Sequence, residues 1–253
     1  KLSIHTVTAI LSLIVFSHIL LLQDGALILS QVVELMSKDA GRETHVVEVG
    51  CGTGLCGIVA AKLGYKSTIT DRSSDLAKLN VDMVKQQMQA SSTSPLEMDA
   101  VVYDMPWESS HASAGNRDTV TDVDGEEPVV SVRSVLNLRG KVDLVVGAEI
   151  TCLRKQQGLL VDTVLQLTAG NPNAVALFSF DGPPQPNGCL YEQDMIDRMA
   201  AVGFSHSVVY VAGCVWVTEH FVQQSGSKAS EKQGNQLHVH KVSKAHQIDR
   251  TEE

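Results

Sequence analysis

The chain has 253 residues, 43% of them hydrophobic, which suits one α/β domain with a sizeable core. A net charge of −9 and the lack of a Lys/Arg-rich stripe argue against a nucleic-acid partner, because phosphate binding needs a concentrated basic surface. Five cysteines without a C-x-x-C pair indicate buried thiols in a reducing compartment, which predicts a cytoplasmic protein, with the nucleus as an alternative.

The two ends of the chain differ in character from the middle. Residues 1–22 are hydrophobic, and 6–22 carry no formally charged group. That length is at the lower limit for a membrane span, so a packed element or a wrongly assigned gene start is favoured, and membrane contact stays an alternative. Polar, aperiodic residues 223–253 predict a disordered tail, which leaves residues 23–222 as the domain.

Within the domain, β-branched runs alternate with segments whose apolar residues recur at helical spacing. Strands are expected at 45–49, 66–70, 100–103, 142–146, 174–180, 208–211 and 215–220. Helices are expected at 24–37, 55–63, about 74–90, 155–167 and 191–202, with an insertion loop at about 108–128. This order predicts a doubly wound, mostly parallel seven-stranded sheet with helices on both faces and an antiparallel strand at or near the edge.

Acidic residues stand at the ends of the predicted parallel strands. Ligands of such sheets bind where the carboxyl ends of the strands meet, so these side chains are expected to lie together. They are Glu48, Asp71, Asp104, Glu149 and Asp181.

The segment VVEVGCGTGLCGIVAAKLG, residues 46–64, holds two overlapping glycine patterns. Gly52, Gly54 and Gly57 form the G-x-G-x-x-G pattern of dinucleotide sites, whereas E-x-G-x-G-x-G begins at Glu48. A carboxylate beside a pyrophosphate would repel it. The same carboxylate suits a ligand that carries an ammonium group and a sulfonium, as S-adenosylmethionine (SAM) does, so the second pattern is favoured.

This segment and the following ITDRSSDLAKLN resemble motif I and the post-I region of SAM-dependent methyltransferases of the seven-strand class. Three further segments are similar to the protein-lysine branch, the methyltransferase-like group called family 16. LLQDGALILSQVVEL resembles its tryptophan-aspartate helix, YDMPWES its leucine-aspartate-tryptophan segment, and DLVVGAEITC its strand-four signature. The resemblance spans about residues 20–220 and implies a Rossmann-like class I methyltransferase with SAM as cofactor and a protein as substrate.

The resemblance also implies a role for each matched residue. The strand end and glycine loop would bind the methionine and ribose part of SAM, through Glu48, Gly50, Cys51, Gly52 and Gly54. Asp71 would accept hydrogen bonds from the ribose hydroxyls, as it would in a dinucleotide site.

Asp104 and Trp107 would flank the adenine. Equally good interpretations are that Asp104 only ends a strand and that Trp107 is a packed core aromatic. Glu149 would be the catalytic residue that meets the incoming amine. Because a carboxylate raises the pKa of a nearby lysine, its role would be to bind and orient the ammonium rather than to deprotonate it.

Two positions depart from the family pattern. Gln23 stands where the family has tryptophan, and Cys152 where it has tyrosine or phenylalanine. An aromatic face can hold an amine by cation–π attraction, worth about 0.5–2 kcal/mol, and a thiol cannot. Tyr103, Phe178 or Phe180 could supply such a face instead.

The sequence therefore predicts a SAM-dependent N-methyltransferase that acts on a protein lysine. Two alternatives stay open, namely an NAD(P)-dependent oxidoreductase with a Rossmann domain and a catalytically impaired SAM-binding module. No metal site is predicted, because His238, His240 and His246 lie in the polar tail without the spacing of ligands. Nothing in the sequence indicates the oligomeric state.

Overall fold

A computed structural model describes residues 24–37, 43–91, 98–107, 135, 142–150, 156–179, 190–210 and 217–223. The predicted N-terminal segment and insertion loop lie outside these residues, as does the predicted tail apart from Gln223, the last residue of a strand. In the described part of the chain, no helix combines the length and apolarity needed to cross a membrane.

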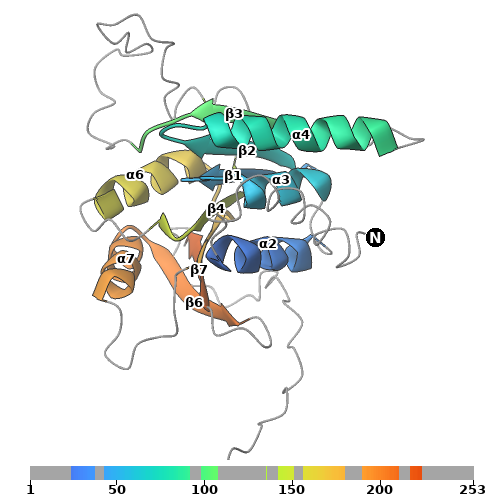
Figure 1. Cartoon of the computed structure of the whole chain (residues 1–253). Helices are drawn as coiled ribbons and strands as arrows, with labels where there is room; N and C mark the ends of the chain where they lie inside the picture. The colour runs from blue at the N-terminus through green and yellow to red at the C-terminus, as the bar shows by residue number, and fades with distance from the viewer. Residues whose placement is uncertain are drawn as a thin grey trace, which may run out of the picture.

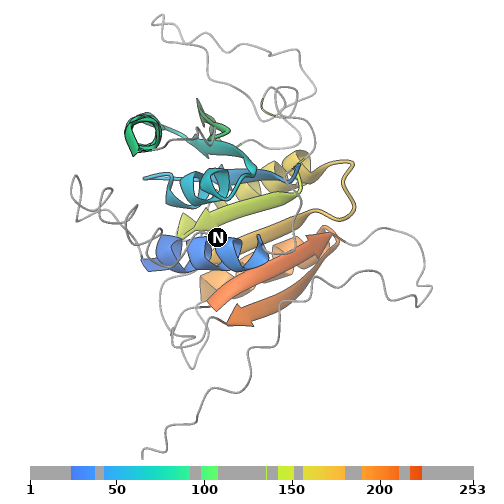
Figure 2. The same ribbon diagram turned by 90° about the vertical axis from the view of Figure 1, so that its right-hand side faces the viewer.

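One seven-stranded sheet, in the order β3-β2-β1-β4-β5-β7-β6, organises the described elements (Figure 2). The strands are β1 His45–Val49, β2 Lys66–Asp71, β3 Ala100–Asp104, β4 Leu144–Ala148, β5 Val175–Ser179, β6 Phe204–Tyr210 and β7 Val217–Gln223. Strands β1 to β5 pair in parallel, and β7 lies antiparallel between β5 and β6. The predicted fold class, with an antiparallel strand next to one edge, is confirmed.

Helices cover both faces of the sheet (Figure 1). They are α2 Asp24–Met36, α3 Leu55–Lys62, α4 Asp75–Ser91, α6 Gln157–Thr168 and α7 Leu190–Ala201. Apolar residues of α6 and α7 pack with β1, β4 and β5 in one core cluster, whereas α2, α3 and α4 build two clusters on the other face. Helix α3 is buried from Leu55 to Ala61, so every side of it packs against other parts of the protein.

The C-terminal strands are longer than expected. Strand β6 begins at Phe204 and β7 ends at Gln223, and these two residues are register partners. In the sequence FSHSVVY of β6, the first residue is followed by the polar stretch SHS. An edge strand pairs on one side only and can carry such residues, so hydrophobic alternation marks its start poorly.

The chain order reverses between β1 and β4. From β1 the chain runs outward through β2 to β3, and it then returns to β4 on the other side of β1. Ligands of open α/β sheets bind in the crevice outside the carboxyl ends of the strands at such a point. The fold therefore predicts a ligand site formed by the residues that follow β1, β2, β3 and β4.

Candidate functional site

A cavity of about 480 Å³ lies at the carboxyl ends of the parallel strands. Its lining combines loop residues that follow strands with the beginning of α6. The residues are Gly50, Asp71, Arg72, Met105, Pro106, Trp107, Ile150, Gln156 and Leu159. Of the residues predicted to bind the cofactor, the cavity brings together Gly50, Asp71 and Trp107.

The loop after β1 approaches the cavity with its backbone. Gly50, Gly52 and Gly54 have φ angles of 64°, 50° and 77°, a left-handed conformation that glycine adopts without strain. A Cβ atom on Gly50 would lie 2.6 Å from Cγ2 of Ile150 and 3.2 Å from Cζ2 of Trp107. Only a residue without a side chain leaves this wall of the cavity open.

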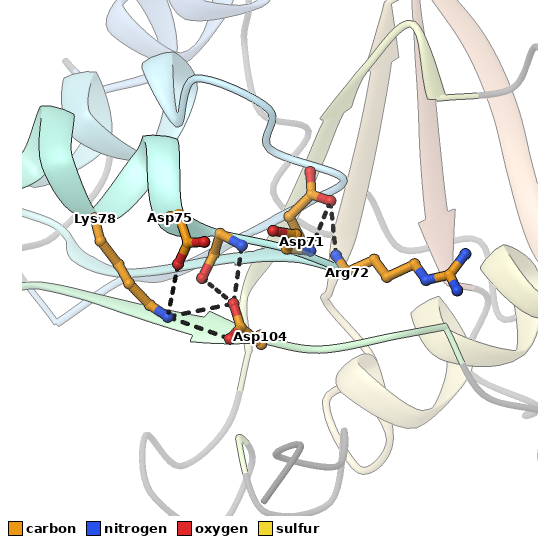
Figure 3. A network of polar contacts seen from close by, with 7 residues as sticks. Asp71, Arg72, Asp75, Lys78 and Asp104 are labelled. Atoms are coloured by element: carbon orange, nitrogen blue, oxygen red, sulfur yellow. Dashed lines mark hydrogen bonds and ion pairs between the residues drawn. The ribbon is translucent and has the colours of Figure 1, made fainter. Parts of the chain in front are cut away.

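Asp71 ties the end of β2 to this loop. Its Oδ2 accepts a hydrogen bond from the N–H of Gly52 over 2.8 Å, and its Oδ1 accepts one from the N–H of Arg72 over 2.7 Å. Figure 3 shows Arg72 extended away from Lys78 and Asp104. A carboxylate can accept about four hydrogen bonds, so Asp71 keeps capacity for hydroxyl groups of a ligand.

Glu48 has a different environment from the one expected. It is 2% exposed, and it does not line the cavity. Its Oε2 accepts the N–H of Gly57 over 2.8 Å and its Oε1 the N–H of Cys56 over 3.3 Å. These are N–H groups of the first turn of α3, whose N-cap residue, Gly54, makes no side-chain cap.

The structure thus corrects the reason why Glu48 separates the two glycine patterns. In a dinucleotide site, the N-terminus of the helix after β1 binds the pyrophosphate. Here the N–H groups at the N-terminus of α3 instead bind the buried side-chain carboxylate of Glu48. Burial raises the pKa of Glu48 from 4.5 to about 7, although the hydrogen bonds from Gly57 and Cys56 favour the ionised form.

Gly57 lies between α3, the sheet and Glu48. A Cβ atom there would lie 2.4 Å from Cγ1 of Ile69 on β2 and 2.9 Å from Oε2 of Glu48. Gly57 is therefore a glycine that lets α3 pack closely on the sheet. Cys51, also assigned to the cofactor, is 7% exposed, and its N–H donates to the carbonyl of Thr70 over 3.0 Å.

Asp104 forms a polar network at the end of β3 (Figure 3). Its Oδ1 accepts hydrogen bonds from the N–H of Ser74, over 2.8 Å, and from the Ser74 hydroxyl, while its Oδ2 lies 3.2 Å from Nζ of Lys78. Burial acts to raise the pKa of Asp104, but these contacts outweigh it and the pKa is lowered. Asp104 does not line the cavity, so its contact with an adenine amine stays a prediction.

Trp107 takes part in the core and also faces the cavity, so its position agrees with both interpretations, a packed core aromatic and an adenine contact. The indole is partly buried and packs against the core cluster that contains Met105 and Ile150, and it also lines the cavity. Neighbouring Pro106 lines the same wall. An aromatic side chain fixed in this way can cover a planar ring without losing further conformational freedom.

Glu149, the predicted catalytic residue, follows β4 and precedes the cavity residue Ile150. Its φ angle is 54°, the one positive value at a non-glycine residue in the described part of the chain. That conformation costs about 1–2 kcal/mol, and such strain persists at functional sites where surrounding contacts enforce it. The N–H of Glu149 donates to the carbonyl of Ser179 over 2.9 Å, and its Oε1 accepts the N–H of Gly25 over 2.9 Å.

Several cavity residues were not predicted. Arg72 and Ile150 each follow a predicted strand-end acid, and this adjacency is a signal that could have found them. Gln156 and Leu159 come from the beginning of α6, and only the tertiary packing of α6 brings them there. Gln23, Cys152, Phe180 and Asp181 lie outside the described residues. Among the residues that are described, no group of three His, Cys, Asp or Glu side chains could hold a metal ion.

Known structures offer remote likenesses. The SAM-bound magnesium protoporphyrin IX methyltransferase of Synechocystis PCC 6803 is 15% identical, with 79% of each chain covered and a TM-score of 0.48. The ribosomal protein L11 methylase of Lactobacillus delbrueckii subsp. bulgaricus is 19% identical, with 78% of this chain and 77% of that chain covered and a TM-score of 0.46.

Sequence comparison identifies nearer relatives. Protein N-lysine methyltransferase METTL21A of Mus musculus is 38% identical over 84 residues, which are 33% of this chain and 36% of the mouse protein. METTL21A of Danio rerio is 29% identical over 148 residues, 58% of this chain and 55% of the fish protein. The chain thus spans about a third to a half of the relatives it matches. The model of the lysine methyltransferase family matches residues 13–113, which confirms the resemblance for the motif I segment, the helix before it and the segment YDMPWES. The strand-four segment DLVVGAEITC lies beyond the matched residues.

Proposed function

We propose that this chain is a SAM-dependent methyltransferase that transfers methyl groups to the amine of a protein lysine. The observation that carries the proposal is the pairing of Glu48 with the N–H groups of Cys56 and Gly57. This pairing fills the anion site of a dinucleotide fold, beside a glycine loop that opens onto the cavity. The match of residues 13–113 to the lysine methyltransferase family supports the same cofactor and acceptor.

The residues of the cavity fit SAM. Gly50 and Gly52 let the backbone approach the ligand, since a Cβ atom on Gly50 would strike Ile150 and Trp107 and residue 52 faces open space. Asp71 offers carboxylate oxygens to ribose hydroxyls, and Trp107 offers an aromatic surface to a purine. Arg72 is the single basic residue among the described residues that line the cavity. The described lining therefore offers no second cation to bind a pyrophosphate.

When bound, SAM supplies an electrophilic methyl group on a sulfonium. The protein then mainly has to align the acceptor nitrogen with that methyl group and to exclude water. A free lysine has a pKa near 10.4, so its neutral form costs about 4–5 kcal/mol at pH 7. Glu149 would bind and orient the arriving ammonium but raise its pKa, so the proton would leave to water.

Calorimetric titration with SAM and, separately, with NADH tests the cofactor. We expect heat with SAM alone, and loss of that heat in Gly52→Arg, which extends a long cation from the loop next to Asp71. The fold of the variant is checked by its thermal unfolding. Heat with NADH and none with SAM would instead support the oxidoreductase.

Tritiated SAM with a cell lysate tests the acceptor. Labelled proteins are hydrolysed in acid, and the amino acids are separated by chromatography. We expect the label in methylated lysines. Binding of SAM without transfer would support the catalytically impaired module, and label in another amino acid would refute the lysine acceptor.

A further inference from the structure

The first turn of α2 contacts the ends of β4 and β5 through one glycine. The N–H of Gly25 donates to Oε1 of Glu149 over 2.9 Å. The hydroxyl of Ser179, the last residue of β5, donates to the carbonyl of Gly25 over 2.8 Å. The N–H of Glu149 donates to the carbonyl of Ser179 over 2.9 Å, which closes the set. These contacts of Gly25, Glu149 and Ser179 are called the α2 clasp below.

The α2 clasp leaves no space for a side chain at residue 25. A Cβ atom on Gly25 would lie 2.9 Å from both Cγ and Oε1 of Glu149, and 3.0 Å from Oγ of Ser179. Gly25 is buried and Ser179 is 1% exposed, so the serine has little freedom to move aside. Any added atom would therefore displace the side chain of Glu149.

The clasp acts on both the carboxylate and the backbone of Glu149. The carboxylate accepts the Gly25 N–H, at the N-terminal end of α2, where the helix dipole is positive. The hydrogen bond to the Ser179 carbonyl holds its backbone in the left-handed conformation, at a φ of 54°. Glu149 is not itself a lining residue of the cavity, but the adjoining Ile150 is, so the strained residue directly precedes the cavity wall.

We propose that Gly25 and Ser179 are positioning residues that fix the carboxylate of Glu149 for an ammonium acceptor, an inference that rests on the proposed function. Gly25 binds one oxygen of the carboxylate, and Ser179 holds both Gly25 and the backbone of Glu149. Neither residue lines the cavity. Their substitution should change the transfer step and not the binding of SAM.

The test compares Gly25→Ala and Ser179→Ala with a matched control, Gly158→Ala. Gly158 lies in α6, where an added Cβ atom would meet only Nη1 of Arg198, at 3.7 Å. The affinity for SAM is measured by calorimetry. The maximal rate and the half-saturating lysate concentration are measured with tritiated SAM over a dilution series of lysate.

We expect Gly25→Ala to lower the maximal rate at least tenfold, and Ser179→Ala several-fold. The half-saturating lysate concentration should rise, the SAM dissociation constant should stay within twofold, and Gly158→Ala should match the wild type. Rates within twofold of the wild type in both clasp variants, or equal losses of SAM affinity, would overturn the inference.

Hydrogen exchange separates this inference from the proposed function. The amides at the beginning of α2 can be followed without substrate, and Ser179→Ala should speed their exchange. Glu149→Gln keeps an acceptor oxygen for Gly25, so it should leave that exchange unchanged while it abolishes transfer. If the wild type neither binds SAM nor labels lysate, the proposed function fails. If exchange is equally fast in the wild type and in Ser179→Ala, the clasp fails.

Discussion

Glu48 and Gly57 are matched at the start of α3, because the N–H of Gly57 donates to Oε2 of Glu48 over 2.8 Å and a Cβ atom on residue 57 would lie 2.9 Å from that oxygen. The same Cβ atom would lie 2.4 Å from Cγ1 of Ile69. The glycine therefore serves both the packing of α3 on β2 and the binding of the buried carboxylate.

Gly57→Ala should destabilise the protein by about 1–3 kcal/mol, the usual cost of an added methyl group in a packed core. Urea unfolding monitored by circular dichroism measures the loss. Gly158→Ala is the control, because a Cβ atom there meets no close neighbour and alanine favours the helix. Equal unfolding midpoints for the two variants would contradict the close packing of α3.

Glu48→Gln should remove a pH dependence of stability. The raised pKa of Glu48, about 7 against 4.5, means that the folded protein holds a proton that the unfolded chain releases. The stabilisation is complete below pH 4.5 and is lost as the pH rises to about 7, in total about 3 kcal/mol.

Urea unfolding at several pH values between 4.5 and 7 measures this difference between the wild type and Glu48→Gln. The two proteins are compared by how steeply their free energy of unfolding changes with pH, not by its absolute value. The absolute value also differs because glutamine accepts from one N–H and leaves the other with a poor partner. Parallel slopes in the two proteins would show that Glu48 ionises normally in the fold.

Asp104 should couple more strongly to Ser74 than to Lys78. Ser74 donates two hydrogen bonds to Oδ1, whereas the ion pair with Lys78 joins side chains that are 43% and 42% exposed and is screened by solvent. Double-mutant cycles of Asp104→Asn with Ser74→Ala, which removes the hydroxyl hydrogen bond and keeps the N–H one, and with Lys78→Met measure both couplings by urea unfolding. We expect about 1 kcal/mol for the first and about 0.5 kcal/mol or less for the second. The reverse order would show that the ion pair fixes the beginning of α4.

Trp107→Ala should weaken SAM binding about tenfold, since base–aromatic stacking contributes about 1–3 kcal/mol. The variant loses one wall of the cavity but leaves the glycine loop in place. Calorimetry measures the affinity, and quenching of indole fluorescence by SAM in the wild type provides a second signal. Leu79→Ala, at a residue of α4 that is 50% exposed, is the control. An unchanged affinity would leave Trp107 as a core anchor alone.

The sequence could predict which strands end at the site. Buried β-branched runs define β1, β2 and β4. Asp71 and Asp104, the last residues of β2 and β3, are register partners in the sheet. Strand periodicity and chain order suffice for such a placement, because parallel strands bring their carboxyl ends to one edge.

The direction of each side chain could not be predicted in the same way. Glu48 turns under the loop toward α3, and Asp104 turns toward Ser74. Both side-chain directions depend on which unpaired N–H groups the tertiary structure places next to the carboxylate. The contact of Gly25 with Glu149 joins residues 124 positions apart, a separation over which no local pattern has a signal.

The buried carboxylate of Glu48 also links ligand binding to protons. Because burial raises its pKa to about 7, Glu48 changes its ionisation close to neutral pH. A cation bound at the adjoining loop favours the ionised form, so the proton and the cation compete, and by reciprocity each lowers the affinity for the other. Binding of a sulfonium ligand would then release a fraction of a proton to the buffer, and we expect its affinity to increase as the solution becomes more alkaline through neutrality.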